Sequence, residues 1–266
     1  MTEIRWKHIL IDNSEVKTDF LTAYRNALRE GSVLASAFDT ETTGLHPIID
    51  VPFLFQCGWL EVHGTTVYGF VGNIEIDKHL NLAKSFIRNW NKLTEHSPLY
   101  LGHNVNFDQH MTENIGCRYD KWDNLSDTQF YIRASSDAIQ TDRGGESIAL
   151  KQWATRHIDV HASSDESILK QLRSEQAQKY NKQFLESCGL TKGKVDKFFK
   201  DKTHEYTDFP PDVQQKYIEW INTLPLYLRE TTNIKGLVER DDIRYDMIDR
   251  ACVLEYAYKD IEFTLT

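Results

Sequence analysis

The sequence has no apolar run long enough to cross a membrane and no paired-cysteine motif. None of its apolar stretches reaches about 18 residues, and the polar start MTEIRWKH lacks the pattern of a signal peptide. The four cysteines are isolated, without a C-x-x-C pair, so the sequence indicates neither a disulfide framework nor a zinc site. These absences predict a cytoplasmic protein with no membrane partner.

Basic residues are in the minority. Lysine and arginine number 31 against 40 aspartates and glutamates, which gives a formal net charge of −9. Proteins that bind nucleic acid tightly on their own usually carry a basic surface, so this charge argues against such a binder. The 266 residues, 40% of them hydrophobic, suffice for one large domain or one domain with an insertion.

Apolar periodicity predicts alternating strands and helices through the first part of the chain. A helix is expected over 14–29 with Ser14 as its cap. A strand follows at 32–41, and then two strands form a hairpin around Gly64. Further helices enclose the short apolar strand PLYLGHN, so the element order is β-β-β-α-β-α-α. This order predicts an α/β fold with helices packed on a mixed sheet.

The composition changes over residues 163–250, where long charged helices are expected and no strand pattern is present. We interpret this segment as a helical insertion within a single domain of residues 1–266. Its stretch KGKVDKFFKDK (192–202) interleaves lysines with two phenylalanines. An amphipathic helix with solvated lysines is the favoured interpretation, and a guide for single-stranded DNA is the alternative.

Two acids stand at the end of an otherwise apolar strand. In SVLASAFDTE (32–41) both alternating sets are largely apolar, which is typical of a strand covered on both faces. Side chains repeat every two residues along a strand, so Asp39 and Glu41 point to the same side. Converging carboxylates repel each other unless a cation lies between them. Two solvated acids at a strand end are the simpler interpretation, and D-x-E alone favours it.

Two other segments offer acids that could join this pair. LGHNVNFDQHM (101–111) places Asp108 just past a strand, where a helix begins. YAYKD (256–260) places Tyr256 and Asp260 four residues apart, on one face of a helix. Taken singly, Asp108 could be an acid at a helix N-terminus and Asp260 a surface acid. The evidence for a shared site is the occurrence of all three segments together, in this order along the chain.

These three segments resemble the motifs of a known enzyme family. FDTETTGL, GHNVNFD and YAYKD resemble, in this order, the motifs of the DEDD-type 3′–5′ exonucleases of the tyrosine subclass. The closest likeness is to the proofreading domain of family A DNA polymerases. SDTQFYIRA (126–134) and SIALKQWA (147–154) resemble segments that the family has between its motifs. The resemblance covers about 14–162 and 250–266, and it implies a ribonuclease H-like αβα fold with a mixed five-stranded sheet.

The resemblance also implies a catalytic site that binds metal. The catalytic residues would be the four metal-binding carboxylates and one tyrosine that orients the attacking water: Asp39, Glu41, Asp108, Asp260 and Tyr256. Phosphodiester hydrolysis fits such a set, because two divalent ions about 3.5–4 Å apart can activate water and hold the leaving oxygen. Mg²⁺ prefers oxygen ligands, so it is the expected ion, with Mn²⁺ as a substitute.

Substrate contacts carried over from the family are five: Thr40, Thr42, Leu45, Asn104 and Phe107. Backbone amides around Thr40 and Thr42 would meet the terminal sugar, and Leu45 would wedge beside the terminal base. Asn104 would touch the nucleotide just inside the 3′ end, and Phe107 would stack on a base. Loop packing for Leu45 and core packing for Phe107 are the alternatives.

The resemblance implies that the chain removes nucleoside 5′-monophosphates from the 3′ end of single-stranded DNA. The sequence has no fingers or palm motif of a polymerase and ends shortly after Asp260. We therefore expect a separate or truncated proofreading module whose partner is a DNA polymerase domain or subunit. The unusual helical insertion is compatible with a viral replication system, in which case the protein would lie in the host-cell cytoplasm.

Two alternatives stay open at the level of sequence. The first is a ribonuclease D-like exoribonuclease of the same subclass, which keeps the chemistry and changes the substrate. The second is an inactive exonuclease fold that serves as an interaction module of a replication complex. The TTGL loop and SIALKQWA favour DNA over RNA, and the intact set of acids with Tyr256 favours an active enzyme.

Overall fold

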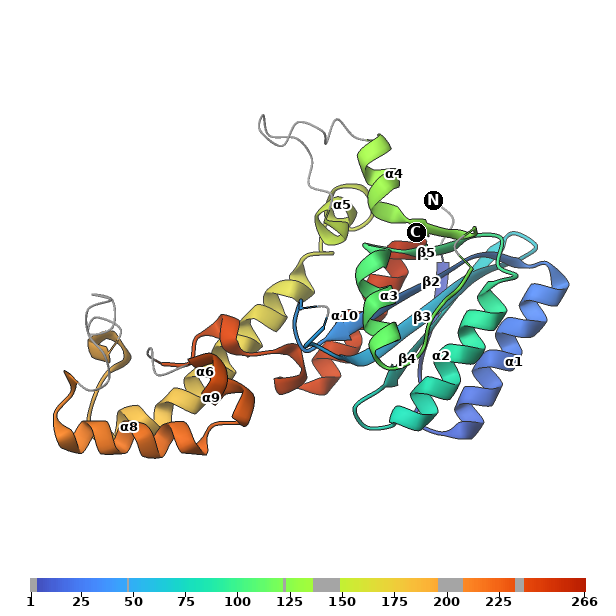
Figure 1. Cartoon of the computed structure of the whole chain (residues 1–266). Helices are drawn as coiled ribbons and strands as arrows, with labels where there is room; N and C mark the ends of the chain where they lie inside the picture. The colour runs from blue at the N-terminus through green and yellow to red at the C-terminus, as the bar shows by residue number, and fades with distance from the viewer. Residues whose placement is uncertain (1–3, 47, 122, 136–148, 196–207, 233–236) are drawn as a thin grey trace. The chain divides into compact units, whose positions relative to one another are not determined.

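The computed structural model describes residues 4–46, 48–121, 123–135, 149–195, 208–232 and 237–266 (Figure 1). The chain divides into two compact units. Unit 1 consists of residues 1–166 and 250–266, and unit 2 consists of residues 167–249. That residues 163–250 are an insertion into a single domain stays a prediction.

Unit 1 is built on one mixed sheet (Figure 1). Its strands are β1 (Ile4–Leu10), β2 (Val33–Thr42), β3 (Pro52–His63), β4 (Thr66–Glu75), β5 (Tyr100–Gly102) and β6 (Leu125–Asp127). They lie in the order β1-β4-β3-β2-β5-β6. The hairpin β3–β4 and the pair β2–β3 are antiparallel, whereas β1–β4, β2–β5 and β5–β6 are parallel. The predicted α/β class, with helices packed on a mixed sheet, is confirmed.

The sheet has six strands where five were expected. The N-terminal strand β1 was not predicted, because it is an edge strand whose residues are half-buried or exposed and give no clean apolar alternation. The three-residue β6 is too short to show a period, and the residues that follow it form helix α4 (Thr128–Ser135). The predicted hairpin at Gly64 is confirmed, with Gly64 in the left-handed region at φ 63°.

Two helices cover one face of the sheet. Helices α1 (Ser14–Glu30) and α2 (Leu80–Thr94) supply aromatic side chains to a core that includes Trp59 of β3. Tyr24 and Trp90 stack there with ring centroids 4.6 Å apart. The predicted cap of the first helix was wrong by one residue. Asn13 is the cap, since its side chain accepts hydrogen bonds from two backbone amides of the first turn.

Helix α10 (Arg250–Leu265) covers the other face, which β2, β3, β4 and β5 form. Its Ile261 packs among buried residues of those strands, including Ala37. Gly58 of β3 makes this approach possible, because a Cβ there would lie 2.8 Å from Ile261 Cγ2. The tight contact sets the depth of the turn of α10 that carries Asp260.

Unit 2 is helical. Its elements are most of α6 (Ser164–Cys188), then α8 (Pro211–Thr223), α9 (Leu226–Thr232) and the 3₁₀ turns η3 (Arg240–Asp242) and η4 (Tyr245–Met247). A core of its own includes Phe184, Tyr217 and Trp220. Basic and acidic residues balance in its sequence, so the whole net charge of −9 belongs to unit 1.

The structure bears on two further sequence predictions, one for the lysine-rich stretch and one for membrane-spanning segments. Most of the lysine-rich stretch at 192–202 lies outside the described residues, so its predicted roles are untested. Among the described residues, no helix combines the length and the apolar character needed to cross a membrane.

Candidate active site

Three carboxylates converge between the sheet and α10. Asp39 and Glu41 lie at the end of β2, two residues apart, and therefore on the same face. Asp260 reaches them from the middle of α10. One carboxylate oxygen from each of the three lies within 4.8 Å of the others. Glu41 and Asp260 are buried and Asp39 is half-buried.

Asp108 lies beside this group in the first turn of helix α3 (Val105–Asn114). Its Oδ1 accepts two hydrogen bonds from Thr40, one from the backbone amide at 3.1 Å and one from the hydroxyl at 2.5 Å. Thr40 stands between Asp39 and Glu41 on β2. The second-motif acid is thus tied to the strand of the first motif, although it does not belong to the group of three oxygens.

Burial and mutual repulsion raise the pKa values of these acids. Loss of hydration, reinforced by the charge of Asp260, raises the pKa of Asp39 to about 8. Burial, followed by the charge of Asp39, raises the pKa of Glu41 well above its usual value, and the same two causes act on Asp108. Burial also raises the pKa of Asp260. A bound cation would favour the ionised forms of all four.

A lysine that the sequence reasoning missed supplies positive charge to the group. Lys151, near the start of α5 (Leu150–His157), is only 7% exposed, and its Nζ lies 2.9 Å from Asp260 Oδ1. The same Nζ lies over the ring of Tyr256, 3.0 Å from its centroid. Its charge lowers the pKa of Asp260 and of Asp39, in opposition to burial. The ammonium group of Lys151 therefore contacts both Tyr256 and Asp260.

Asn104, predicted to touch the nucleotide inside the 3′ end, has an unusual backbone. Its φ of 64° makes it the one non-glycine residue with positive φ in the described part of the chain. Asp127 of β6 fixes this turn, since its carboxylate accepts the amides of Asn104 at 3.0 Å and Val105 at 3.1 Å. Sequence reasoning missed Asp127, although it belongs to the SDTQFYIRA segment.

The other predicted substrate residues are spread around the acids. Thr42 ends β2, and its hydroxyl donates to the carbonyl of Gly44 at 2.6 Å. Leu45 is 83% exposed in the loop that follows. Phe107 on α3 is half-buried, and Asn104 is exposed. Packing of Leu45 into the loop is therefore excluded in this structure, whereas Phe107 keeps both interpretations.

The donors suit a hard divalent cation. The converging atoms are carboxylate oxygens, with no histidine or cysteine in the group, and this is the ligand chemistry that Mg²⁺ and Mn²⁺ prefer. Carboxylates crowded in a buried site, with raised pKa values, gain most from an added positive charge. Asp39, Glu41 and Asp260 would hold one ion, and the residues present fit that group.

Replacing Asp39 with asparagine should stabilise the metal-free protein at alkaline pH. The carboxyl keeps its proton up to about pH 8 in the folded state but loses it near pH 4 when unfolded. The stability that wild type has with a protonated Asp39 is therefore fully present below about pH 4 and is lost as the pH rises through 8. Urea unfolding in chelator should show that Asp39→Asn increases the free energy of unfolding more at pH 8.5 than at pH 5. At pH 8.5 the increase should be on the order of 1–4 kcal/mol. A gain that is the same at both pH values would contradict the raised pKa.

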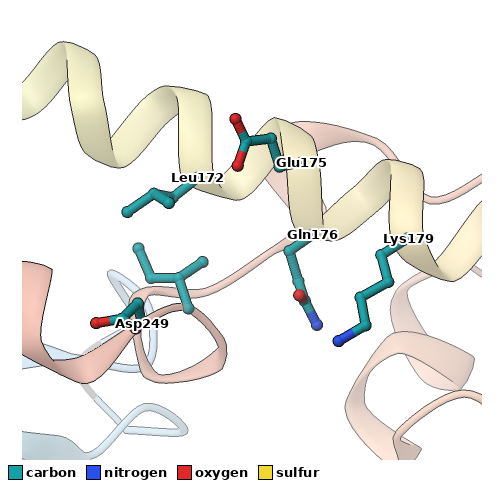
Figure 2. Close-up of a pocket in the computed structure, with 6 residues that line it drawn as sticks. Leu172, Glu175, Gln176, Lys179 and Asp249 are labelled. Carbon is teal, nitrogen blue, oxygen red and sulfur yellow. The ribbon is translucent and has the colours of Figure 1, made fainter.

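A separate hollow lies within unit 2, with a volume of about 250 Å³ (Figure 2). Its lining residues are Leu172, Glu175, Gln176, Lys179, Ile248 and Asp249. None of the predicted site residues belongs to it, so the chemistry expected from the sequence is confined to unit 1.

Comparisons with known proteins give weak structural similarities. The EXO domain of Nibbler from Aedes aegypti is 14% identical, with a TM-score of 0.29 over 51% of this chain and 57% of that one. NrnC from Brucella melitensis with bound Mg²⁺ is 21% identical, with a TM-score of 0.33 over 60% and 63%. A second NrnC structure from this organism is 22% identical, with a TM-score of 0.34 over 60% and 62%.

No protein-family model matches the chain, and no curated protein matches it. The chain covers less than two thirds of the length of each of the three structures, and all three TM-scores lie below 0.5. We therefore infer the function from the residues of this chain.

Proposed function

We propose that the protein is a metal-dependent 3′–5′ exonuclease that removes nucleoside 5′-monophosphates from the 3′ end of DNA. The observation that carries this proposal is the convergence of Asp39, Glu41 and Asp260 within 4.8 Å of one another. Asp39 and Glu41 belong to the first motif of the exonuclease resemblance and Asp260 belongs to the third, more than 200 residues later in the sequence. Asp108, held on Thr40, completes the set.

Each residue has a task in this reaction. When bound, divalent cations supply an activated water and neutralise charge on the phosphate. Asp39, Glu41 and Asp260 would hold one cation, and Asp108 with Asp39 would hold a second. Tyr256, one helical turn from Asp260, orients the water through its hydroxyl. The buried setting of the acids strengthens every one of these interactions, since water competes less well there.

The substrate assignment rests on the segments around the acids. The TTGL loop and the SIALKQWA stretch favour DNA, and the exposed Leu45 at the end of the first motif suits a wedge against the terminal base. The net charge of −9 in unit 1 favours a partner that holds the rest of the nucleic acid, for which we propose a DNA polymerase domain or subunit. A ribonuclease D-like exoribonuclease is the nearest alternative.

A labelled-oligomer assay tests the proposal. With Mg²⁺ or Mn²⁺, a single-stranded DNA labelled at its 5′ end should give a ladder of products shortened one nucleotide at a time, and chelator should stop the reaction. A DNA blocked by a 3′-terminal phosphorothioate linkage serves as the control for direction. Faster shortening of the matched RNA would establish the exoribonuclease instead. Absence of hydrolysis with either ion, at any protein concentration, would favour the inactive interaction module.

A further inference from the structure

A fully buried amide lies in the most apolar part of the sheet. Gln56 is 0% exposed in β3, where its neighbours Phe55 and Cys57 are buried as well. Burying an amide without hydrogen bonds costs on the order of 1–3 kcal/mol, so an ordinary core strand would place an apolar residue there. The position of Gln56 therefore calls for a specific partner.

The partners of Gln56 are two of the clustered carboxylates. Its Nε2 donates to Asp39 Oδ2 at 2.8 Å and to Glu41 Oε1 at 3.3 Å. The sheet register explains the contact, because Gln56 pairs directly with Asp39 across β2 and β3. One NH₂ group has two hydrogens, so it can bridge two acceptors at once. Gln56 thereby links the two acids that the first motif contributes.

A second buried amide, on the neighbouring strand β4, makes its hydrogen bond to the backbone and not to the acids. Asn73 of β4 pairs with Gln56 in the register and is also 0% exposed. Its Nδ2 donates to the carbonyl of Leu254 in α10 at 3.1 Å. Asn73 thus fastens the helix to the sheet, whereas the described contacts of the Gln56 amide group go to the carboxylates.

A neutral bridge suits a site that must accept a cation. Lys151 also approaches the acids, but its positive charge competes with an incoming divalent ion. The amide of Gln56 carries no net charge, so it can hold two carboxylates at a fixed spacing and stay in place when an ion binds. It also leaves one oxygen of each carboxylate outside the bridge. Hydrogen-bond partners of metal ligands commonly contribute 10- to 100-fold to metal affinity.

We propose that Gln56 is a positioning residue that sets the spacing and orientation of Asp39 and Glu41 for a divalent cation. The inference rests on the proposed function only for the presence of that cation. Gln56 touches neither the nucleic acid nor the reacting atoms in this scheme, and it acts through the two acids. It therefore affects ion binding, which can be measured without any substrate.

Titration of the metal-free chain with Mn²⁺, followed by the electron paramagnetic resonance signal of the free ion, tests this role. Gln56→Met keeps the length of the side chain and removes both donors. We expect it to weaken Mn²⁺ binding about 10- to 100-fold. Asn91→Leu is the matched control, because it removes another buried amide of unit 1, whose Nδ2 donates to the carbonyl of Arg118. It should lower the melting temperature and leave the Mn²⁺ dissociation constant unchanged.

The outcomes separate this inference from the proposed function. Gln56→Met that binds Mn²⁺ as tightly as wild type would overturn the positioning role. Wild type that binds no Mn²⁺ would overturn the proposed function, and the positioning role would fall with it. Should Gln56→Met fail to fold, Gln56→Asn replaces it. That variant keeps the amide but is one methylene shorter, so it should also bind Mn²⁺ more weakly than wild type, and wild-type affinity would again refute the bridge.

Discussion

Replacing Asp260 with asparagine should reduce the rate of 3′-end hydrolysis by about 10³-fold or more. The side chain keeps its shape but loses the charge that would bind a divalent ion next to Asp39 and Glu41. The fold should survive, because the loss of the Lys151–Asp260 ion pair is offset by relief of repulsion at Asp39 and Glu41, both of which also feel the charge of Lys151. Single-turnover hydrolysis of 5′-labelled DNA, together with thermal unfolding of the metal-free variant, measures both effects.

Glu255→Gln is the control for this substitution. Glu255 belongs to the same helix and is exposed, so its loss removes one negative charge from α10 without touching the cluster. Its hydrolysis rate should equal that of wild type. Near-full activity of Asp260→Asn, or an equal loss in the two variants, would show that Asp260 binds no catalytic ion.

Replacing Lys151 with methionine should destabilise the metal-free protein by about 3–5 kcal/mol at pH 8.5. Both partners of the Lys151–Asp260 pair are largely withdrawn from solvent, with side chains 9% and 12% exposed. Removal of the ammonium leaves the carboxylate buried without its cation, beside two further acids. Saturating Mg²⁺ should recover part of the loss, because a bound divalent ion supplies the missing charge. Chemical unfolding in chelator and in Mg²⁺ gives the two values.

Lys259→Met provides the comparison for a pair that water reaches. Lys259 Nζ lies 2.7 Å from Asp165 Oδ2, but the lysine side chain is 34% exposed. Such pairs contribute about 0–1 kcal/mol, so this variant should unfold almost as wild type does. If Lys151→Met were no more destabilising than Lys259→Met, Lys151 would not be the counter-ion of the acids.

Sequence reasoning identified the acids because short local patterns, each weak alone, occur together in the order of a known family. Asp39 and Glu41 interrupt an apolar strand at a spacing of two, and Tyr256 and Asp260 share a helix face. Lys151 gives no such signal, since a lysine in an amphipathic helix is normally solvated, and its contacts with Tyr256 and Asp260 of α10 follow only from the fold. Gln56 is recognisable in the sequence as the single amide among the apolar residues of β3. Its partners could not be predicted, because they depend on the register between β2 and β3.

Elements of the fold formed by neighbouring residues were likewise predictable from the sequence, whereas contacts between distant segments were not. The β3–β4 hairpin was predicted from a glycine turn between two apolar runs. Strand β1 could not be predicted in this way, because it is added in parallel to β4 from a segment more than 50 residues earlier. The close contact between Gly58 and Ile261 of α10 joins residues that are still further apart in sequence. Contacts between remote segments thus decide which side chains surround the acids.

The uneven distribution of charge between the two units affects how a nucleic acid would reach the acids. Unit 1 and a phosphate chain carry the same sign, so they repel each other at distances beyond direct contact. Mobile ions weaken this repulsion beyond about 8 Å at physiological ionic strength. Under the proposed function, capture of a strand from dilute solution would be slow, and a strand end already held nearby by another molecule would have the advantage.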